Sequence, residues 1–135
     1  MAIKMSVTVR NARGNSIETS IGASAVLKIR TGAPPTNIAD ADTGTVLATL
    51  TLPADWLAAA SNGVVAKAGT WSDAAGDAAG SAGHFRIYAT DGTTQHMQGT
   101  VTATGGGGDL TLDNISIAVG QAVTITAFSL TEGNA

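Results

Sequence analysis

Apolar positions near the start of the chain recur at helical spacing and predict a helix over residues 6–21. The apolar stripe of this helix consists of Val9, Ala12, Ile17 and Ile21. Ser6 is a suitable N-cap, and Gly22 suits the left-handed position that follows a last helical turn. Gly14 in the interior costs about 1 kcal/mol relative to alanine. An extended segment over Ile3–Val9 is the alternative.

After the helix the apolar period changes to alternation, which is typical of half-buried strands. The pattern predicts strands over residues 24–31, 45–52, 64–71, 84–90, 94–102, 109–113, 115–119 and 122–131. In the strand 84–90 the alternation places Phe85, Ile87 and Ala89 inward and His84, Arg86 and Tyr88 outward. The pairs Asn62-Gly63 and Asp91-Gly92 predict tight turns.

The segments between these strands carry loop signals. Pro34 and Pro35 prevent ladder pairing in the loop 32–44, and residues 72–83 form a second loop of small residues. Four consecutive glycines, Gly105–Gly108, connect two strands. Proline is tolerated at the first helical position, so residues 53–61 are expected to form a short helical turn.

Many short strands bounded by turns indicate an all-β fold. The two long loops favour an antiparallel jelly-roll-like β-sandwich with a short N-terminal helix over a simple meander. We expect an N-terminal arm and helix over residues 1–22 and a single β-sandwich domain over residues 23–135.

Composition limits the classes of protein to which this chain can belong. Hydrophobic residues make up 44% of the 135 residues and charged residues 13%, so the chain is neither disordered nor highly charged. There is no cysteine, which excludes disulfides and thiolate chemistry. The start MAIKMSVTVRNARG has no apolar run of signal-peptide length, and no segment is apolar enough to span a membrane. We expect a protein that folds in a cytoplasm.

The charge of the chain is unevenly distributed. Residues 1–30 hold most of the basic residues against a single acid, Glu18, whereas the rest of the chain is acidic. The basic residues of this segment are Lys4, Arg10, Arg13, Lys28 and Arg30. Such a start could dock onto an acidic partner or onto a sister subunit. The alternative is a solvated helix face without a partner.

The sequence contains little from which a catalytic centre could form. His84 and His96 are the only candidate bases, and they flank one hairpin. Asp40 and Asp42 lack the further ligands of a calcium loop, and the glycine run lacks the GK[ST] ending of a phosphate loop. We therefore expect no enzyme activity, no metal and no cofactor. The acidic balance also argues against nucleic acid as a partner.

Three aromatic residues are candidates for stacking against sugars: Trp56, Trp71 and Tyr88. β-Sandwich modules often bind glycans through exposed aromatic rings. The other interpretation of the two tryptophans places them under loops as part of the core.

Several stretches resemble a group of small virion proteins of tailed bacteriophages. They are LKIRTGAPPTNIADADTGTVLATLTLP (27–53), GHFRIYATDGTTQHMQGTV (83–101), GGGGDLTLDN (105–114) and IAVGQAVTITAFSLTEGNA (117–135). The resemblance implies a head decoration, or cement, protein with a jelly-roll-like β-sandwich. Gly14 departs from the pattern, because a helix-favouring apolar residue is expected there.

A cement protein holds adjacent major capsid subunits together on the outer surface of the virion. The resemblance therefore implies the major capsid protein as a partner. Twofold symmetry is the commonest closed arrangement of subunits, so we expect a homodimer in preference to a trimer. The five basic residues of 1–30 are the expected capsid contact. The alternatives are a tail-associated or head–tail virion protein and a glycan-binding module.

Overall fold

The computed structural model describes residues 3–135. Helix α1, Val7–Ile21, begins and ends where its sequence signals place it. The side chain of Ser6 accepts a hydrogen bond from the amide of Val9 at 3.3 Å. At the other end Gly22 has a φ of 105°, and its amide donates to the carbonyl oxygen of Glu18. The predicted helix is confirmed, including both caps, and the extended alternative is wrong.

The buried face of α1 differs from the predicted apolar stripe. Arg10, Gly14 and Ile21 are buried, whereas Val9 is 47% exposed. The helix lies close to strand β3, Val64–Ala66, and a Cβ atom at position 14 would come within 2.5 Å of a methyl carbon of Val65. The close approach requires glycine at this position, which explains a residue that is unfavourable for the helix itself.

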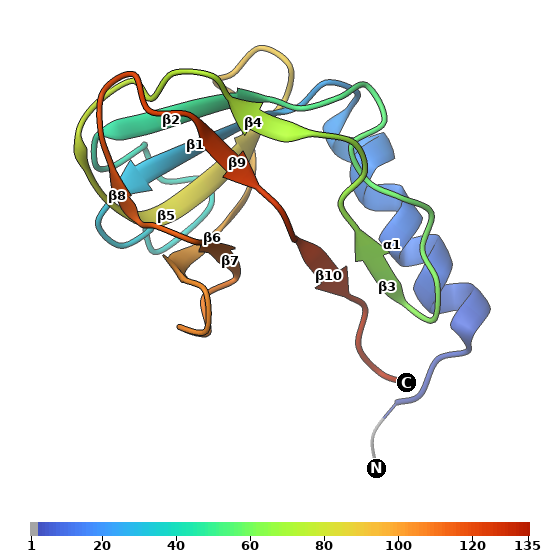
Figure 1. The fold of residues 1–135 in the computed structure, drawn as a ribbon. Helices are drawn as coiled ribbons and strands as arrows, with labels where there is room; N and C mark the ends of the chain where they lie inside the picture. The colour runs from blue at the N-terminus through green and yellow to red at the C-terminus, as the bar shows by residue number, and fades with distance from the viewer. Residues whose placement is uncertain (1–2) are drawn as a thin grey trace.

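The largest sheet is curled into a half-barrel, with strand order β2-β1-β5-β6-β7 (Figure 1). Its strands are β1 (Val26–Thr31), β2 (Val46–Thr51), β5 (Gly80–Tyr88), β6 (Gln95–Ala103) and β7 (Leu110–Leu112). The first four pair antiparallel, and β7 joins β6 in parallel. A short strand β8, Ser116–Ile117, pairs with the start of β5.

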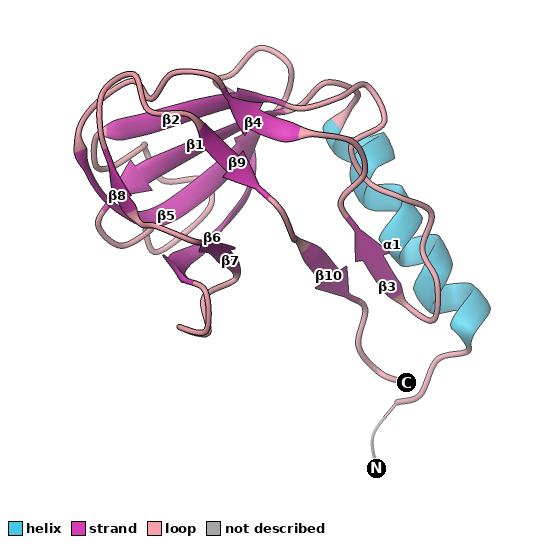
Figure 2. Cartoon of the chain, viewed as in Figure 1, coloured by secondary structure: helices cyan, strands magenta, loops and turns pink. Residues whose placement is uncertain are grey.

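Two further strand pairs complete the fold (Figure 2). Strand β4, Trp71–Asp73, pairs with β9, Val123–Ile125, and β3 pairs with β10, Ser129–Thr131. The β4–β9 pair is attached to the half-barrel at β2, because the amide of Thr49 donates to the carboxylate of Asp73 and the amide of Asp77 donates to the carbonyl of Leu47. The β3–β10 pair lies beside α1, away from the half-barrel.

The structure confirms a mostly β fold with one helix but does not confirm the jelly-roll-like sandwich. Two predicted strands are each divided in the structure. The strand 64–71 breaks at Gly69, where φ is 68°, and the strand 122–131 breaks between β9 and β10. The parallel pairing of β6 with β7 also departs from an antiparallel sandwich.

The core lies between the half-barrel and the β4–β9 pair, and aromatic rings occupy its centre. The ring of Trp71 lies 5.9 Å from that of Trp56 and 5.3 Å from that of Phe128. Phe85 approaches Phe128 edge-on at 5.9 Å. Each indole N–H donates to a backbone carbonyl, that of Gly22 or Ala68. Both tryptophans are therefore satisfied core residues.

The segment 53–61 is not the helical turn that the sequence predicted. It is extended, with isolated bridges from Leu57 to Lys67 and from Ser61 to Val64. The tight turn at Asn62-Gly63 is confirmed, since both residues have positive φ, 51° and 76°. The backbone amides of Ala58 and Ser61 donate to the following strand, and those of Leu57 and Ala60 donate to side chains of α1, so these contacts stabilise the extended form in place of a helical turn.

Candidate functional site

A buried ionic cluster lies beneath the loop 32–44, on the face of β5 that the sequence placed toward solvent. His84, Arg86 and Tyr88 are each fully buried. The prediction that they point outward is wrong, because the loop folds over this face and covers it. Alternation along a strand shows that two faces exist, but it does not show that a distant loop covers the polar one.

Arg86 is the central residue of the ionic cluster. Its guanidinium donates to the side-chain oxygen of Gln98 at 2.9 and 3.0 Å and to a carboxylate oxygen of Asp42 at 2.9 Å. It also donates to backbone carbonyls of the loop, including that of Asp40 at 2.9 Å. The side-chain amide of Gln98 donates to the backbone carbonyl of Pro35 at 2.7 Å. These bonds hold the loop against β5 and β6.

Asp42 is the shared acceptor of the cluster. It accepts hydrogen bonds from Tyr88 at 2.7 Å, from Arg86 and from Arg30 at 2.8 Å. Burial opposes ionisation of this carboxyl, but the bonds from Tyr88 and Arg86 and the charge of Arg30 outweigh it and hold the pKa of Asp42 below its ordinary value. Burial and the bond to Asp42 raise the pKa of Tyr88.

His84 lies at the edge of the same cluster. Its Nδ1 donates to the carbonyl oxygen of Gly32 at 2.9 Å, and its Nε2 is buried without a hydrogen-bond partner. Burial, reinforced by the charges of Arg30 and Arg86, lowers the pKa of His84 from the ordinary value of 6.5. The histidine is therefore neutral near neutral pH and serves to fasten the loop.

The structure separates the five predicted capsid-contact residues into two groups. Arg10 and Arg30 are buried, the first donating to the carbonyl of Asn62 at 3.0 Å and the second held by Asp42. This burial makes Arg10 and Arg30 structural residues, which corrects their assignment as surface contacts. The other three lie at or near the surface.

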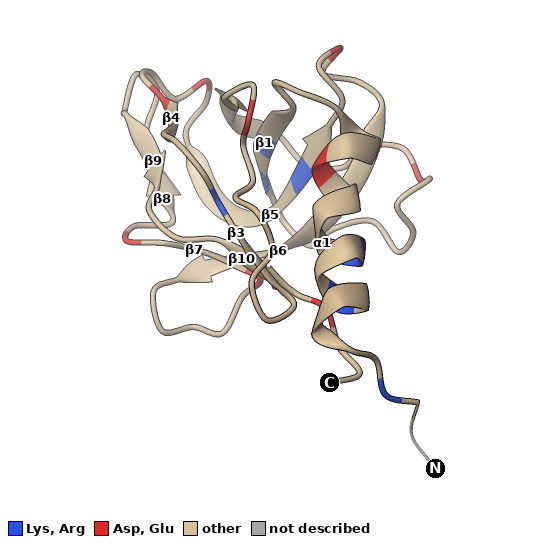
Figure 3. Cartoon of the chain, turned by 90° about the vertical axis from the view of Figure 1, so that its right-hand side faces the viewer, with Lys and Arg blue, Asp and Glu red and all other residues tan. Residues whose placement is uncertain are grey.

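Lys4 is exposed on the arm, and Arg13 forms a half-exposed ion pair with Glu132 at 3.1 Å. Lys28 lies over the ring of Tyr88, 5.0 Å from its centroid, and donates to the carbonyl of Gly92. Figure 3 shows basic residues along the arm and the first part of α1, with acidic residues spread over the loops. Lys4 and Arg13 are therefore the basic groups of the N-terminal segment that remain accessible.

The residues predicted to stack against a sugar are not available to do so. Trp56, Trp71 and Tyr88 are each fully buried. The two tryptophans lie in the aromatic core, and Tyr88 lies beneath the loop 32–44 with its hydroxyl on Asp42. Sugar stacking requires an exposed ring face, so this part of the prediction is wrong.

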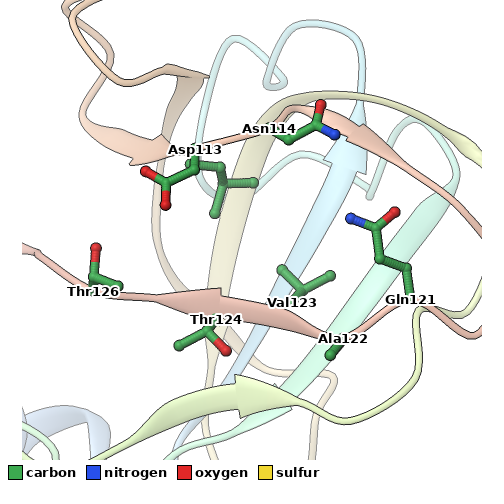
Figure 4. A pocket seen from close by; sticks show the side chains of 8 residues that line it. Asp113, Asn114, Gln121, Ala122, Val123, Thr124 and Thr126 are labelled. Carbon is green, nitrogen blue, oxygen red and sulfur yellow. The ribbon is translucent and has the colours of Figure 1, made fainter.

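Two shallow clefts open on the surface. The first, of about 220 Å³, lies where β7 and β9 approach each other without pairing, with Asp113 and Asn114 on one side and residues of β9 on the other (Figure 4). Asp113 is its only titratable group. It therefore holds no pair of groups suited to acid–base catalysis.

The second cleft, of about 250 Å³, lies between α1 and the segment 53–61. Three side chains of the helix accept hydrogen bonds from backbone amides across it: Glu18 from Leu57, Asn15 from Ala60 and Asn11 from Gly63. Burial and the neighbouring carboxylate of Asp55 raise the pKa of Glu18. These polar residues attach α1 to the body of the protein, a role that the sequence analysis did not foresee.

Within residues 3–135 no group of three or more His, Cys, Asp or Glu side chains is arranged to hold a metal ion. In the same part of the chain, no helix has the length and apolar character needed to cross a membrane.

Two short strands near the C-terminus of the described chain, β9 and β10, each have one edge that pairs with no other strand. β9 pairs only with β4, and β10 pairs only with β3. The segment Ala122–Thr131, AVTITAFSLT, contains no charged residue and no proline. Sequence analysis identified the strand but not its free edge, although the absence of charge was a visible signal.

The chain was also compared with known proteins. No family model, curated protein or solved structure matches it.

Proposed function

We propose that this chain is a structural virion protein that decorates a tailed-phage capsid and stabilises it by bridging adjacent major capsid subunits. The stretches of sequence that resemble phage decoration proteins support this role. The disposition of the polar residues supports it as well, because the cluster around Arg86 holds a loop in place and leaves no open site.

One observation carries the proposal: a mixed apolar and basic surface at the N-terminal end of α1. This N-terminal surface consists of Ile3 and Lys4 of the arm together with Val9 and Arg13, which are exposed four residues apart on α1. Ile3 is 74% exposed and Val9 47% exposed. Exposed aliphatic side chains beside basic groups are typical of protein-binding surfaces. In the proposal this surface contacts the capsid, and the excess positive charge complements an acidic partner.

Stabilisation follows from repetition. A decoration protein adds buried area between neighbouring capsid subunits, and a modest contact becomes strong when many copies and several contacts act together. A homodimer is the expected unit, with a trimer as the second choice. A jelly-roll-like sandwich is part of the proposal, with the β4–β9 pair as its second layer over the half-barrel. The particle surface is the proposed location.

The test is binding to purified capsids that lack the protein. Val9→Asp and Ile3→Asp are expected to lower occupancy at least about tenfold, because each places a desolvated charge in the contact. Val119→Asp is the matched control, since Val119 is equally exposed, at 70%, in the loop before β9. Full occupancy by both N-terminal variants would refute the proposed contact surface.

A further inference from the structure

Strand β10 has hydrogen-bonding groups on one edge that nothing in the described chain satisfies. Its residues Ser129, Leu130 and Thr131 pair with Ala66, Val65 and Val64 of β3. No other strand of residues 3–135 pairs with β10. An edge of this kind is complementary to one class of partner, an extended backbone.

Apart from its shortness, three residues, the edge lacks the devices that usually prevent strand addition. Natural edge strands carry lysine, proline or a bulge that blocks a second chain. The segment Ala122–Thr131 has no charge and no proline, and five of its ten residues are β-branched: Val123, Thr124, Ile125, Thr126 and Thr131. By contrast, β2 at the far end of the half-barrel is covered by β4 and its following loop.

The β3–β10 sheet is incomplete by itself. Two strands in isolation are marginally stable, and they become stable through further strands or through packing against a helix. Helix α1 covers one face of this pair, where Val65 and its partner Leu130 are directed. The other face presents Val64, which is 37% exposed, together with the exposed Ala66, Ser129 and Thr131. This face is small, uncharged and unobstructed.

We propose that β10 pairs antiparallel with β10 of a second copy of the chain, which joins the two β3–β10 pairs into one four-stranded sheet. The twofold axis passes beside Leu130, so that Ser129 of each copy lies opposite Thr131 of the other. The inference names the surface of the homodimer proposed above; it rests on that dimer and not on the capsid-binding role.

The absence of charge favours a second copy as the occupant. Each copy has a net charge of −3, so two copies repel one another wherever their acidic surfaces approach. A neutral edge placed against itself creates no like-charge pair, and the twofold arrangement forms two Ser–Thr pairs that are favourable across antiparallel strands. The edge is therefore complementary to itself.

The oligomeric state of the purified chain and of edge variants tests this inference. Sedimentation velocity over a range of concentrations is expected to show a monomer–dimer equilibrium. Ser129→Lys and Thr131→Glu, each made alone, are expected to raise the dimer dissociation constant about tenfold. Each variant introduces the same charge at the same position of both copies, and in the proposed pairing these two like charges lie diagonally opposite each other and repel. Combining both changes in one chain places opposite charges face to face and is expected to restore dimerisation to within about threefold of the parent.

Thr93→Lys, in the exposed hairpin after β5, is the matched control and is expected to leave the dimer unchanged. Ser129 and Thr131 are exposed and point away from α1, so the variants should fold, which tryptophan fluorescence confirms. A monomeric parent overturns the inference, as does a dimer that Ser129→Lys leaves intact. If Ile3→Asp abolishes the dimer, the interface lies at the N-terminal arm and the inference is overturned. If the double variant does not regain dimerisation, the proposed antiparallel register is wrong. Capsid binding is measured separately: a parent chain that is monomeric yet still occupies capsids would overturn this interface and leave the capsid-binding role standing.

Discussion

Replacing Asp42 with asparagine is expected to destabilise the fold strongly, because it removes the only carboxylate from between two buried guanidinium groups. Arg86 is fully buried, and the side chain of Arg30 is 8% exposed. Breaking a buried ion pair by removing one partner costs about 3–5 kcal/mol. The side chain of Asp42 is 36% exposed, and Arg86 keeps its bonds to Gln98, which reduces the cost. We expect a loss of about 2–4 kcal/mol.

Equilibrium unfolding in urea, followed by the fluorescence of the two core tryptophans, measures this loss. With a slope of about 2 kcal/mol per molar urea, the midpoint is expected to fall by roughly 1–2 M. Asp113→Asn is the matched control, because this carboxylate is exposed and its change should alter stability by less than about 0.5 kcal/mol. If Asp42→Asn also stays within about 0.5 kcal/mol of the parent, the cluster does not hold the loop and the reasoning is wrong.

The other predictions concern the helix contact, the histidine and the aromatic core, each measured by urea unfolding. Gly14→Ala is expected to cost about 1–3 kcal/mol despite alanine's better helix propensity, because the new methyl group collides with Val65; a gain in stability would contradict the close approach. The pKa of His84 in the folded protein lies below 6.5, so the stability contributed by the neutral histidine is complete above that pH and is lost as the pH falls. The urea midpoint should therefore drop on acidification, and it should drop less in His84→Gln. An equal drop in both proteins would refute the assignment. Trp71→Ala is expected to cost about 3–5 kcal/mol, and a near-neutral effect would place Trp71 outside the core.

Features set by neighbouring residues could be predicted from the sequence. The bounds of α1 follow from Ser6 and Gly22, and the hairpin after β5 follows from Asp91-Gly92. Each signal acts within a few residues, through a cap or a positive φ, so no knowledge of the rest of the chain is needed.

Features set by distant contacts could not be predicted. The burial of Arg86 depends on a loop more than forty residues earlier, and the role of Gly14 depends on Val65. The alternation in β5 gave the correct two faces but the wrong environment for one of them. The large aromatic residues illustrate the same limit, because their type favoured both a core and a sugar-binding role and only the fold separates the two.

The candidate contact residues show how far a charge argument extends. The excess of basic residues near the start of the chain is a fact of the sequence, yet Arg10 and Arg30 are buried while Lys4 and Arg13 remain accessible. A count of charged residues does not distinguish a buried arginine that donates to a backbone carbonyl from an exposed arginine that can bind a partner.

Cryo-microscopy of the virion on which the chain is proposed to lie tests the central claim most directly. The proposed role predicts density for the chain at many symmetry-related positions over the capsid, with the N-terminal surface against the major capsid protein. Density for a few copies arranged in a ring at the head–tail junction or the tail, or none on the particle, would contradict it.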